Sequence, residues 1–381
     1  MFYQLPPAGN SIHFHRQADV SIASIFPGYS VQFYASGTTA LAAALVAAIK
    51  KSESESAEVI LPAYGCPDLI SAVIYAGAKP VLVDLEEDRP WLCLAQLTSV
   101  LTTNTVAIIA VNLFGISERW KKLRLLIEQR NIVLVEDSAQ YFPRHTDALQ
   151  NWQGDMVVLS FGRGKPVSLL GGGAVLTKIP ALFERLPESR QSLSGSAQRF
   201  SFALKARLYN GLISPYLYWL PEALPFLHLG ETRYHALTDM AAMDQVRLGL
   251  LQGNISRYQN DMDAAYRVER ISATLDALMK VQNLPKLCDS GVQSSLLRYP
   301  LLLDSSLRNL LYRKLKQAGL GASILYPASL PQIAGLHEIL DDKQTFPNAE
   351  KFAAQLLTLP THSRVSEKDL NQMNTILKQW L

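Results

Sequence analysis

The stretches Val135-Glu-Asp-Ser-Ala-Gln140 and Leu159-Ser-Phe-Gly-Arg-Gly-Lys165 decide the fold class of this chain. In each, a short apolar run comes to its end and is followed by polar or glycine-rich residues. This pattern is typical of a buried strand that ends in a loop. Asp137 ends the first apolar run, and Lys165 lies in the loop after the second. The two stretches therefore predict strand ends that carry a carboxylate and an amine.

Similar apolar runs recur along the first half of the chain, separated by segments with helical patterns. The expected strands are residues 58–62, 80–84, 106–112, 132–136, 156–160 and 173–177, and the expected helices are residues 36–51, 68–76, 91–101 and 118–129. Short continuous strands that alternate with helices predict an α/β fold with a large, mostly parallel sheet covered on both faces.

Polar residues stand at the ends of several of these strands. Asp84, Asn112, Asp137 and Ser160 lie at or just past the expected carboxyl ends. Ligands of open parallel sheets bind beyond those ends, so we expect these four residues to lie together. Tyr64, Cys66, Arg163, His235, Tyr326 and His362 fall in loop-like places and are further candidates for the lining of a pocket.

The second half of the chain has a different pattern. Residues 195–280 read as long helices, and residues 292–381 as a smaller α/β unit. In that unit we expect strands at 296–303 and 323–326 and helices at 306–318, 348–356 and 367–380. Residues 1–32 read as an irregular lead-in. This predicts a large domain over 1–250 and a small C-terminal domain over 251–381, with the boundary inside a helix near 240–260.

Composition excludes several classes of protein. With 381 residues, 48% of them hydrophobic, the chain can bury a large core, and a net charge of +3 gives no electrostatic case for a nucleic-acid partner. Three widely spaced cysteines indicate neither a disulfide framework nor a zinc site, and no third ligand accompanies His13 and His15, so no metal site is expected. The N-terminus lacks the pattern of a signal peptide, which predicts a cytoplasmic protein.

One apolar stretch, residues 211–227, raises the question of a membrane. It contains Pro215, Pro221 and Pro225 as well as Glu222, and three prolines break a spanning helix. We therefore expect no membrane-spanning segment. Packing at a subunit interface and contact with a membrane surface or a lipid-linked substrate remain open for this stretch.

The carboxylate and the lysine suit one cofactor, pyridoxal 5'-phosphate (PLP). A lysine amine can hold the cofactor aldehyde, and a carboxylate can keep the pyridine nitrogen protonated. Ser36-Gly-Thr-Thr39 opens a helical segment and suits a phosphate cradle, although an ordinary helix cap has the same residues. Taken singly, Asp137 also fits a structural salt bridge, and Lys165 also fits a solvated surface residue. Dinucleotide and P-loop patterns are absent.

Taken in order, the motifs resemble the DegT/StrS family of sugar aminotransferases, within the fold-type I PLP-dependent transferases that share the aspartate aminotransferase-like fold. The resemblance runs from about residue 30 to the C-terminus and is poor over 190–232. Besides the two opening stretches, it rests on Ser36-Gly-Thr-Thr-Ala-Leu41, Val59-Ile-Leu-Pro-Ala-Tyr64, Ala76-Gly-Ala-Lys-Pro-Val-Leu-Val-Asp84, Val111-Asn-Leu-Phe-Gly115, Phe346-Pro-Asn-Ala-Glu-Lys351 and Leu359-Pro-Thr-His362.

The resemblance implies a role for each matching residue. Lys165 would hold the cofactor and move the proton, and Asp137 would pair with the pyridine nitrogen. Gln140 would contact the ring's phenolic oxygen. Thr38, Thr39 and Ser160 would hold the phosphate. The family also implies a homodimer with shared active sites, in which loops near 230–240 reach the partner's site.

The chain departs from the family pattern at a few positions. Cys66 stands where an aromatic ring often stacks on the cofactor, with Tyr64 as a possible replacement. Pro166 stands where an asparagine usually follows the lysine, and residues 233–239 lack the asparagine of the interface loop. These changes concern the substrate more than the cofactor.

The expected activity is transfer of an amino group from glutamate or glutamine to a keto-sugar, nucleotide-linked, for a surface polysaccharide or a natural product. The alternatives are a PLP enzyme that acts on a non-sugar ketone or catalyses dehydration, and a non-catalytic PLP-fold binding or regulatory protein. Family dehydratases replace the lysine with histidine, and this chain retains Lys165.

Overall fold

The structure is a computed structural model of the chain. It describes residues 3–14, 25–144, 152–189, 196–224, 231–278, 281–288, 296–340 and 344–381.

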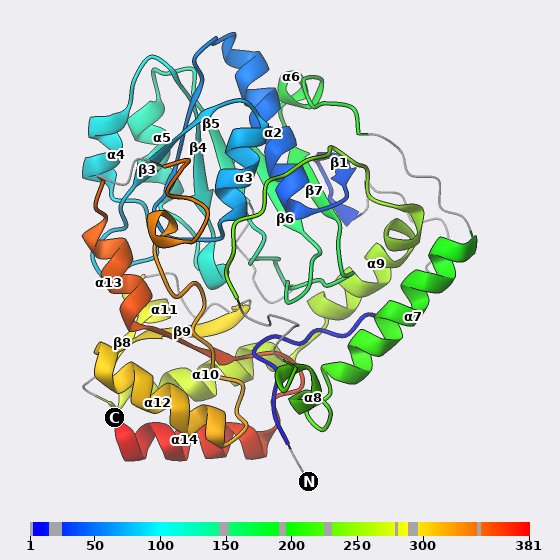
Figure 1. Cartoon of the computed structure of the whole chain (residues 1–381), viewed down its shortest axis with the longest axis vertical. Coiled ribbons are helices and arrows are strands. Elements are labelled where there is room, and N and C mark those ends of the chain that lie inside the picture. The colour runs from blue at the N-terminus through cyan, green and yellow to red at the C-terminus, as the bar shows by residue number, and fades with distance from the viewer. Residues whose placement is uncertain are drawn as a thin grey trace.

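A seven-stranded sheet forms the centre of the larger part (Figure 1). Its order is β1-β7-β6-β5-β4-β2-β3. The strands are β1 (Ser30–Tyr34), β2 (Glu58–Pro62), β3 (Lys79–Val83), β4 (Thr105–Val111), β5 (Val133–Asp137), β6 (Met156–Ser160) and β7 (Gly173–Thr177). The five strands from β6 to β3 run parallel, and β7 and β1 are antiparallel to their neighbours. The expected large, mostly parallel sheet is confirmed.

Helices cover both faces of this sheet, as the alternation of buried residues in β2 shows. Val59 and Leu61 pack in one apolar cluster, with α2 (Gly37–Ser52) and α3 (Asp68–Tyr75). Ile60 points the other way, into the cluster of α4 (Leu94–Val100) and α5 (Trp120–Ile127). Because neither face of the strand meets water, the sequence reads as a continuous apolar run. The small side chains of α2, six of them buried alanines, let this helix lie close to the sheet.

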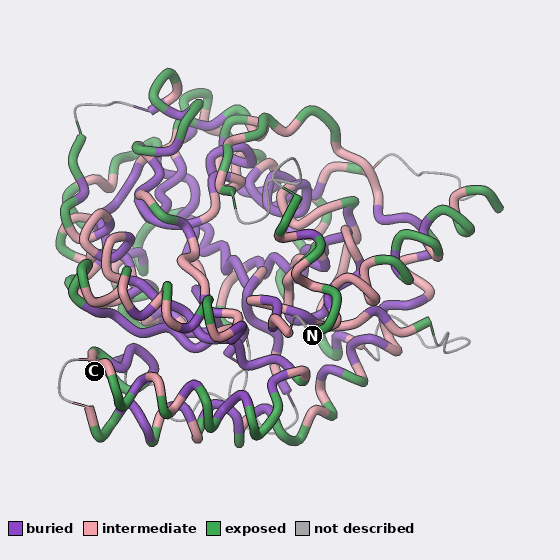
Figure 2. The backbone as a smooth tube through the Cα atoms, turned by 60° about the horizontal axis from the view of Figure 1, so that its bottom comes forward, coloured by how far each residue is buried: buried purple, intermediate pink, exposed green. Residues whose placement is uncertain are grey.

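The second part contains a small antiparallel sheet of order β10-β9-β8. Its strands are β8 (Gln282–Asn283), β9 (Arg298–Leu302) and β10 (Leu356–Pro360). The remaining helices are α6 (Pro180–Phe183), α7 (Ser196–Leu212), α8 (Trp219–Glu222), α9 (Gln245–Gln259), α10 (Asp263–Asp276), α11 (Leu284–Leu287), α12 (Ser305–Gln317), α13 (Pro347–Gln355) and α14 (Glu367–Trp380), with short 3-10 turns η1 (Leu113–Gly115) and η3 (Leu330–Gln332). Figure 2 shows buried backbone through the interior and exposed residues on the outer helices.

Several expected elements differ from the structure. Residues 323–326 do not form a strand: Ser323 makes only an isolated bridge to Thr358, and Tyr326 has a φ of +49°, which strands do not adopt. β1 begins inside the segment expected as an irregular lead-in and extends past its end, and it forms an edge of the large sheet. β10 follows α13 directly, so the helix expected at 348–356 ends one residue early.

The packing of α9 and α10 bears on the division of the chain. α9 packs under β6 and β7, whereas α10 packs with α14 and the small sheet. The division into residues 1–250 and 251–381 stays a prediction, because α9 passes through that point as one helix.

In the described part of the chain, no helix has the length and apolarity needed to cross a bilayer. The apolar stretch 211–227 lies at the end of α7 and in α8, and its last residues, 225–227, are outside the described residues.

Candidate active site

A cavity opens at the carboxyl edge of the large sheet. Its volume is about 540 Å³, which includes the solvent at its mouth. Its lining residues come from the ends of β4, β5 and β6, from the starts of α2 and α3, and from the loops that follow. They are Gly37, Thr38, Leu41, Cys66, Asp68, Leu69, Val111, Leu113, Asp137, Ala139, Gln140, Val158, Ser160, Lys165 and Tyr326. Tyr326 alone comes from the C-terminal part. The structure thus brings together six of the seven expected site residues.

Asp137 is the last residue of β5 and is buried at the cavity. Its Oδ1 accepts a hydrogen bond from the Ala139 N–H at 2.9 Å, the one hydrogen bond to this carboxylate among the described residues. Burial raises the pKa of the Asp137 carboxyl, against the opposing effects of that N–H and of the Lys165 charge. A buried carboxylate with so little support is costly unless a cation reaches it. The carboxylate is therefore suited to a cationic ligand.

The neighbouring carboxylate, Glu136, points to the opposite side of the strand and is fully bonded. It accepts hydrogen bonds from the Gln153 and Gly154 N–H groups at 2.6 and 2.8 Å, from Asn112 Nδ2 at 2.7 Å and from the Ser138 hydroxyl at 3.1 Å. Glu136 therefore fastens the loop before β6 to the end of β5.

Lys165 lies in the loop after β6, and its position is set by the N-terminal segment. Asn10 Nδ2 donates to the carbonyl oxygen of Pro166 at 2.7 Å and approaches that of Lys165 at 3.5 Å. Gly164 has a φ of +71°, which turns the chain so that the lysine reaches the cavity. The charge of Lys165 lowers the pKa of both Asp137 and Cys66, so the amine lies within electrostatic reach of each.

The start of α2 forms one wall of the cavity, close against the ends of β6 and β7. A Cβ at Gly37 would lie 2.6 Å from Ser160 Cβ, and one at Gly173 would lie 2.4 Å from the Ser36 carbonyl oxygen. Only glycine permits this approach. The unpaired N–H groups at the start of a 16-residue helix then open onto the cavity, which suits an anion.

The two threonines at this helix start have different environments. The Thr38 hydroxyl lines the cavity and donates to Asp68 Oδ2 at 2.8 Å. Thr39 is buried beside the cap: its N–H donates to the Ser36 hydroxyl at 3.1 Å, and the two hydroxyls are 2.8 Å apart. Thr39 is the expected site residue that does not line the cavity, and its role in phosphate binding stays a prediction.

Gln140 links the cavity to the C-terminal part of the chain. Its Oε1 accepts from the Phe114 N–H at 3.0 Å, and its Nε2 donates to the Tyr326 phenol at 3.2 Å. Both bonds fix the amide with its side chain along the cavity wall. Tyr326, at a φ of +49°, is held in a backbone conformation that a bulky residue rarely adopts, as occurs at ligand sites.

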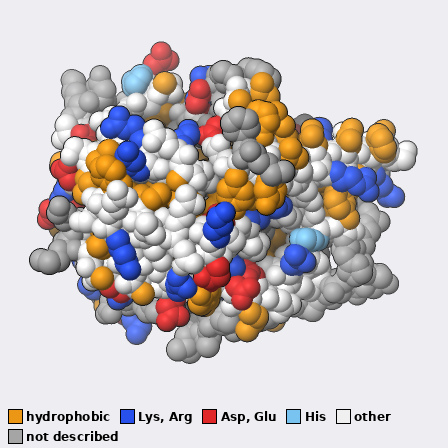
Figure 3. Space-filling model, turned by 90° about the horizontal axis from the view of Figure 1, so that it is seen from below, with side chains coloured by type: hydrophobic (Ala, Val, Ile, Leu, Met, Phe, Trp, Pro, Cys, Tyr) orange, Lys and Arg blue, Asp and Glu red, His pale blue; other side chains and the backbone are white. Residues whose placement is uncertain are grey.

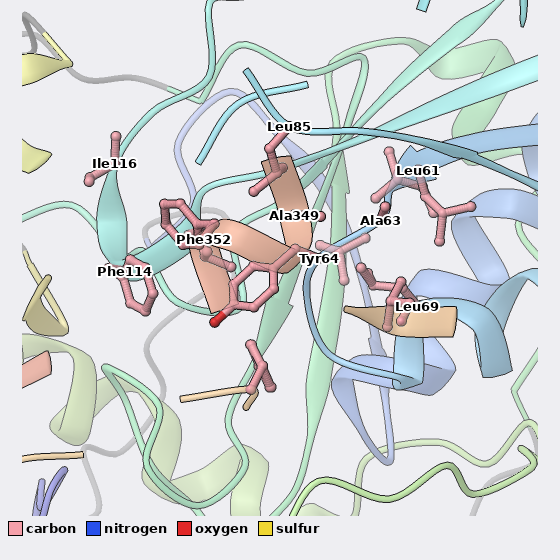
Figure 4. Close-up of a cluster of buried hydrophobic side chains, with 14 of the residues drawn as sticks. Leu61, Ala63, Tyr64, Leu69, Leu85, Phe114, Ile116, Ala349 and Phe352 are labelled. Atoms are coloured by element: carbon pink, nitrogen blue, oxygen red, sulfur yellow. The ribbon is translucent and has the colours of Figure 1, made fainter. Parts of the chain in front are cut away.

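Cys66, and not Tyr64, faces the cavity. Burial raises the pKa of the Cys66 thiol to about 12, so the group is neutral and packs as an apolar side chain. Tyr64 lies in the core, edge-on to Phe352 and Tyr326 with ring centroids 5.1 and 5.8 Å away (Figure 4). Its hydroxyl donates to the Leu325 carbonyl.

Two of the four strand-end residues do not line the cavity, which corrects the expectation that all four lie together there. Asp84 accepts from the Asn348 and Ala349 N–H groups at 3.0 and 2.8 Å and so caps the start of α13. Asn112 donates to Glu136. Of the loop candidates, Arg163, His235 and His362 also lie outside the cavity lining.

Asp68 was missed by sequence reasoning, because it reads as an ordinary first residue of a helix. Its position after Pro67, a few residues past the end of the expected strand 58–62, was the available signal. Among the described residues, no group of three or more histidine, cysteine or acidic side chains could hold a metal ion. His15 is outside those residues.

Two curated relatives share part of the chain. It is 34% identical over 150 residues to dTDP-3-amino-3,4,6-trideoxy-alpha-D-glucose transaminase of Streptomyces venezuelae, covering 39% of each chain. It is 30% identical over 150 residues to GDP-perosamine synthase of Escherichia coli O157:H7, covering 39% of this chain and 40% of the relative. The matched region thus spans about two fifths of the length of these relatives.

A solved structure matches over most of the chain. A putative sugar aminotransferase of Streptococcus pneumoniae, in its PLP form, superimposes with a TM-score of 0.66 at 21% identity, covering 92% of this chain and 88% of the other. This likeness shows the fold, an α/β fold of the PLP-dependent aminotransferase type. The model of the DegT/DnrJ/EryC1/StrS aminotransferase family matches residues 29–378. Together with the ordered motifs, that match makes this chain a member of the DegT/DnrJ/EryC1/StrS aminotransferase family.

Proposed function

We propose that this protein is a PLP-dependent aminotransferase that moves an amino group from glutamate or glutamine to a keto-sugar, nucleotide-linked, in the synthesis of a surface polysaccharide or a natural product. The observation that carries the proposal is that Lys165 and Asp137 line one cavity, where the carboxylate has a single hydrogen bond and no ion pair among the described residues.

The residues present fit PLP. The Asp137 carboxylate, buried and short of donors, suits the protonated pyridine nitrogen. Thr38, Ser160 and the N-terminus of α2 suit the phosphate, and Gln140 suits the phenolic oxygen. When bound, PLP supplies an electron sink for the electrons left on the substrate carbon by proton loss.

The protein's own side chains would then do three things. Asp137 holds a proton at the pyridine nitrogen. The Lys165 amine has no other partner among the described residues. It would move a proton between the substrate carbon and the cofactor carbon. Cys66, neutral because burial raises the pKa of its thiol to about 12, supplies an apolar surface with no competing charge.

A buried arginine supports an amino donor that carries a carboxylate group. Nε and Nη1 of Arg298, at the start of β9, are buried and have no hydrogen-bond partner among the described residues. Burial lowers the pKa of this guanidinium, and Tyr326 at the cavity is close enough to oppose that effect. An unpaired buried guanidinium is costly, and a carboxylate is its best partner. Glutamate and glutamine carry such a carboxylate.

The nucleotide-linked keto-sugar rests on the relatives, which are a transaminase of a dTDP-sugar and a synthase of GDP-perosamine. We further propose a cytoplasmic homodimer with shared active sites, which rests on the family resemblance, in which loops near 230–240 reach the partner's site. In this chain the segment lies beside α3, whose first residues line the cavity, and Ser71 of α3 donates to the His235 carbonyl at 2.6 Å. The three cysteines are free, which supports a reducing compartment.

The test is an absorption spectrum of the purified protein with PLP, before and after glutamate. We expect the band of lysine-bound cofactor in the wild type and its loss on addition of glutamate. Lys165→Ala should lack the band. Lys79→Ala is the matched control, because Lys79 is an exposed lysine paired only with Glu58 at 3.7 Å.

Other outcomes would support the alternatives. A wild type that never forms the band would contradict the enzyme and favour a non-catalytic binding protein. A band that glutamate and glutamine both leave unchanged would retain PLP but move the chemistry to another reaction, such as dehydration. After a positive result, keto-sugars with and without a nucleotide should be compared as acceptors.

A further inference from the structure

The outer surface of α7 and α8 is apolar. Phe200, Leu204 and Leu208 follow each other at intervals of four residues, so they lie on one side of α7, and they are 72%, 60% and 60% exposed. Phe202 and Ala206, on the opposite side, are buried in the protein. The next residues continue the surface with Tyr216, Leu217, Leu220 and Leu224. We call these seven exposed residues the α7–α8 face.

This concentration is unusual for the molecule. The α7–α8 face holds seven of the thirteen large hydrophobic side chains that are exposed in the described part of the chain. Contiguous apolar surface of this kind marks a place where something docks, whereas single exposed leucines do not. Phe14 extends the face, because Arg207 lies over its ring at 5.2 Å.

The charge around the face has one sign. Arg199, Lys205 and Arg207 are exposed on α7, and no Asp or Glu occurs in that helix. At about 100° per residue, Lys205 and Arg207 fall on opposite sides of the apolar stripe, whereas Arg199, at the start of the helix, falls nearer the side of the buried Phe202 and Ala206. The one acid of α8, Glu222, is already paired with Lys316 at 2.8 Å. The face therefore presents apolar side chains between basic ones.

The position of α7 leaves this face open. The helix lies at the right-hand edge of the molecule in Figure 1, and Figure 3 shows hydrophobic and basic side chains together at that edge. Since no described helix can span a bilayer, a membrane contact here would lie in the plane of the headgroups. Lysine and arginine beside such a stripe can reach lipid phosphates while the apolar side chains enter the acyl boundary.

The charge also argues against a second copy of the chain as the occupant. A two-fold axis through the face would bring identical patches together, so arginine and lysine of one α7 would meet those of the other without an acid on either helix. A surface of anionic lipid has the complementary charge.

We propose that the α7–α8 face docks the protein on anionic membrane surfaces. The proposal does not depend on the cofactor or on the substrate. It predicts that the protein partitions onto vesicles that contain an acidic phospholipid, with or without PLP, and that salt weakens the binding.

The experiment is flotation of the full chain with phosphatidylcholine vesicles that either contain or lack phosphatidylglycerol. We expect binding only to the anionic vesicles. Leu204→Glu should lower the partition coefficient about tenfold or more, since it places a carboxylate in the stripe. Arg199→Gln, Lys205→Gln and Arg207→Gln should each lower it about fivefold. Leu125→Glu is the matched control, because Leu125 is 70% exposed on α5, outside the face, and the variant should bind like the wild type.

Two results would overturn the proposal. One is equal binding of wild type and the Leu204→Glu variant to anionic vesicles. The other is no binding by the wild type, together with a halved molar mass of Leu204→Glu in light scattering, which would assign the face to contact between copies. The three charge variants keep the test valid if Leu204→Glu fails to fold by circular dichroism.

Discussion

Glu136 and Asp137 are adjacent acids at the end of one buried strand, yet their surroundings are opposite. Glu136 accepts four hydrogen bonds from the protein, whereas Asp137 accepts one and lines a cavity. Burial raises the pKa of both carboxyls. The number of protein donors, and not burial or the shifted pKa, therefore distinguishes a structural acid from one suited to a ligand.

Other strand ends of the large sheet obey the same distinction. Asp84 is bonded to the N–H groups at the start of α13 and lies away from the cavity. Ser160 ends β6 at the cavity wall, where its hydroxyl has only a long contact of 3.4 Å from the Gly162 N–H. We therefore expect substitution of a fully bonded polar group to lower stability, and substitution of a group with few protein partners to lower activity.

The largest effects are expected from the two adjacent acids, Glu136 and Asp137. Asp137→Asn should lower aminotransferase activity roughly 10²–10³-fold, because it removes the charge that holds the pyridine proton. It should change the free energy of unfolding of the cofactor-free protein by less than about 1 kcal/mol, because a poorly supported buried charge is removed. Activity and urea denaturation of the two variants, Asp137→Asn and Glu136→Gln, measure both effects.

Glu136→Gln should do the reverse. A glutamine has one acceptor oxygen, and its NH₂ group would face either the N–H donors of Gln153 and Gly154 or the donors of Asn112 and Ser138, so we expect a loss of about 3 kcal/mol. The activity of the folded fraction should stay within about an order of magnitude of the wild type. If the two variants lost stability equally, the assignment of a structural role to Glu136 and of a ligand-binding role to Asp137 would be contradicted.

His362 extends the comparison to the C-terminal part, as a buried group with both ring nitrogens in use. Nε2 donates to the Pro6 carbonyl at 2.8 Å, and Nδ1 accepts from the Arg364 N–H at 3.3 Å. Burial, with help from nearby arginines, lowers the pKa of His362 from 6.5 to about 4. Between these two pKa values, His362 is protonated in the unfolded chain and neutral in the folded protein. The free energy of unfolding therefore falls as the pH falls from 6.5 toward 4.

We expect this histidine to cost about 2.4 kcal/mol of stability between pH 7 and pH 4.5. The measurement is urea denaturation at the two pH values for wild type and His362→Gln. The variant should be less stable at pH 7 but lose less on acidification. An equal loss in both proteins would assign the acid sensitivity to other groups.

Asp84→Ala tests a fully bonded acid far from the chemistry. It removes the acceptor for the N–H groups of Asn348 and Ala349 at the start of α13, and we expect a loss of about 2 kcal/mol. Thermal unfolding measures the loss. The affinity for PLP, measured by fluorescence titration, should stay within about twofold of the wild type, and a larger change would place Asp84 in the site after all.

The smallest effects should separate the two threonines at the start of α2. Thr38→Val should weaken PLP binding about tenfold, because it removes a hydroxyl that lines the cavity. Thr39→Val should change it by less than about twofold, since the Thr39 hydroxyl serves the helix cap. Titration of the apoprotein with PLP gives both values, and a larger effect for Thr39 would contradict the assignment.

The sequence predicted the frame of the large domain because each strand is short, apolar and bounded by polar or glycine residues. Strands at 156–160 and 173–177 were predicted with their observed ends. β1 was missed because Ser30–Tyr34 carries no long apolar run: as an edge strand, it needs β7 beside it to exist. Residues 323–326 have the composition of a strand, but the turn at Tyr326 prevents one.

The site was predictable where chemistry and position coincided, and not elsewhere. Asp137 and Ser160 stand at strand ends and Lys165 in the loop after β6, and the structure does place them on one cavity. Asp84 stands at a strand end too, and no pattern in the sequence shows that its acceptors are taken by α13, 264 residues later. Asp68 reads as a helix start, and only the fold turns it toward the cavity. Their chemical roles remain predictions.

The composition of the cavity lining has a consequence for how such a protein diversifies. Of the lining residues, Tyr326 alone comes from beyond the large sheet and its loops, and its phenol accepts a hydrogen bond from Gln140 Nε2. The groups suited to the cofactor thus come from the large sheet and its loops, whereas Tyr326 comes from the C-terminal part of the chain. Mutation and selection can reshape substrate choice from the Tyr326 side while the inherited chemistry stays intact.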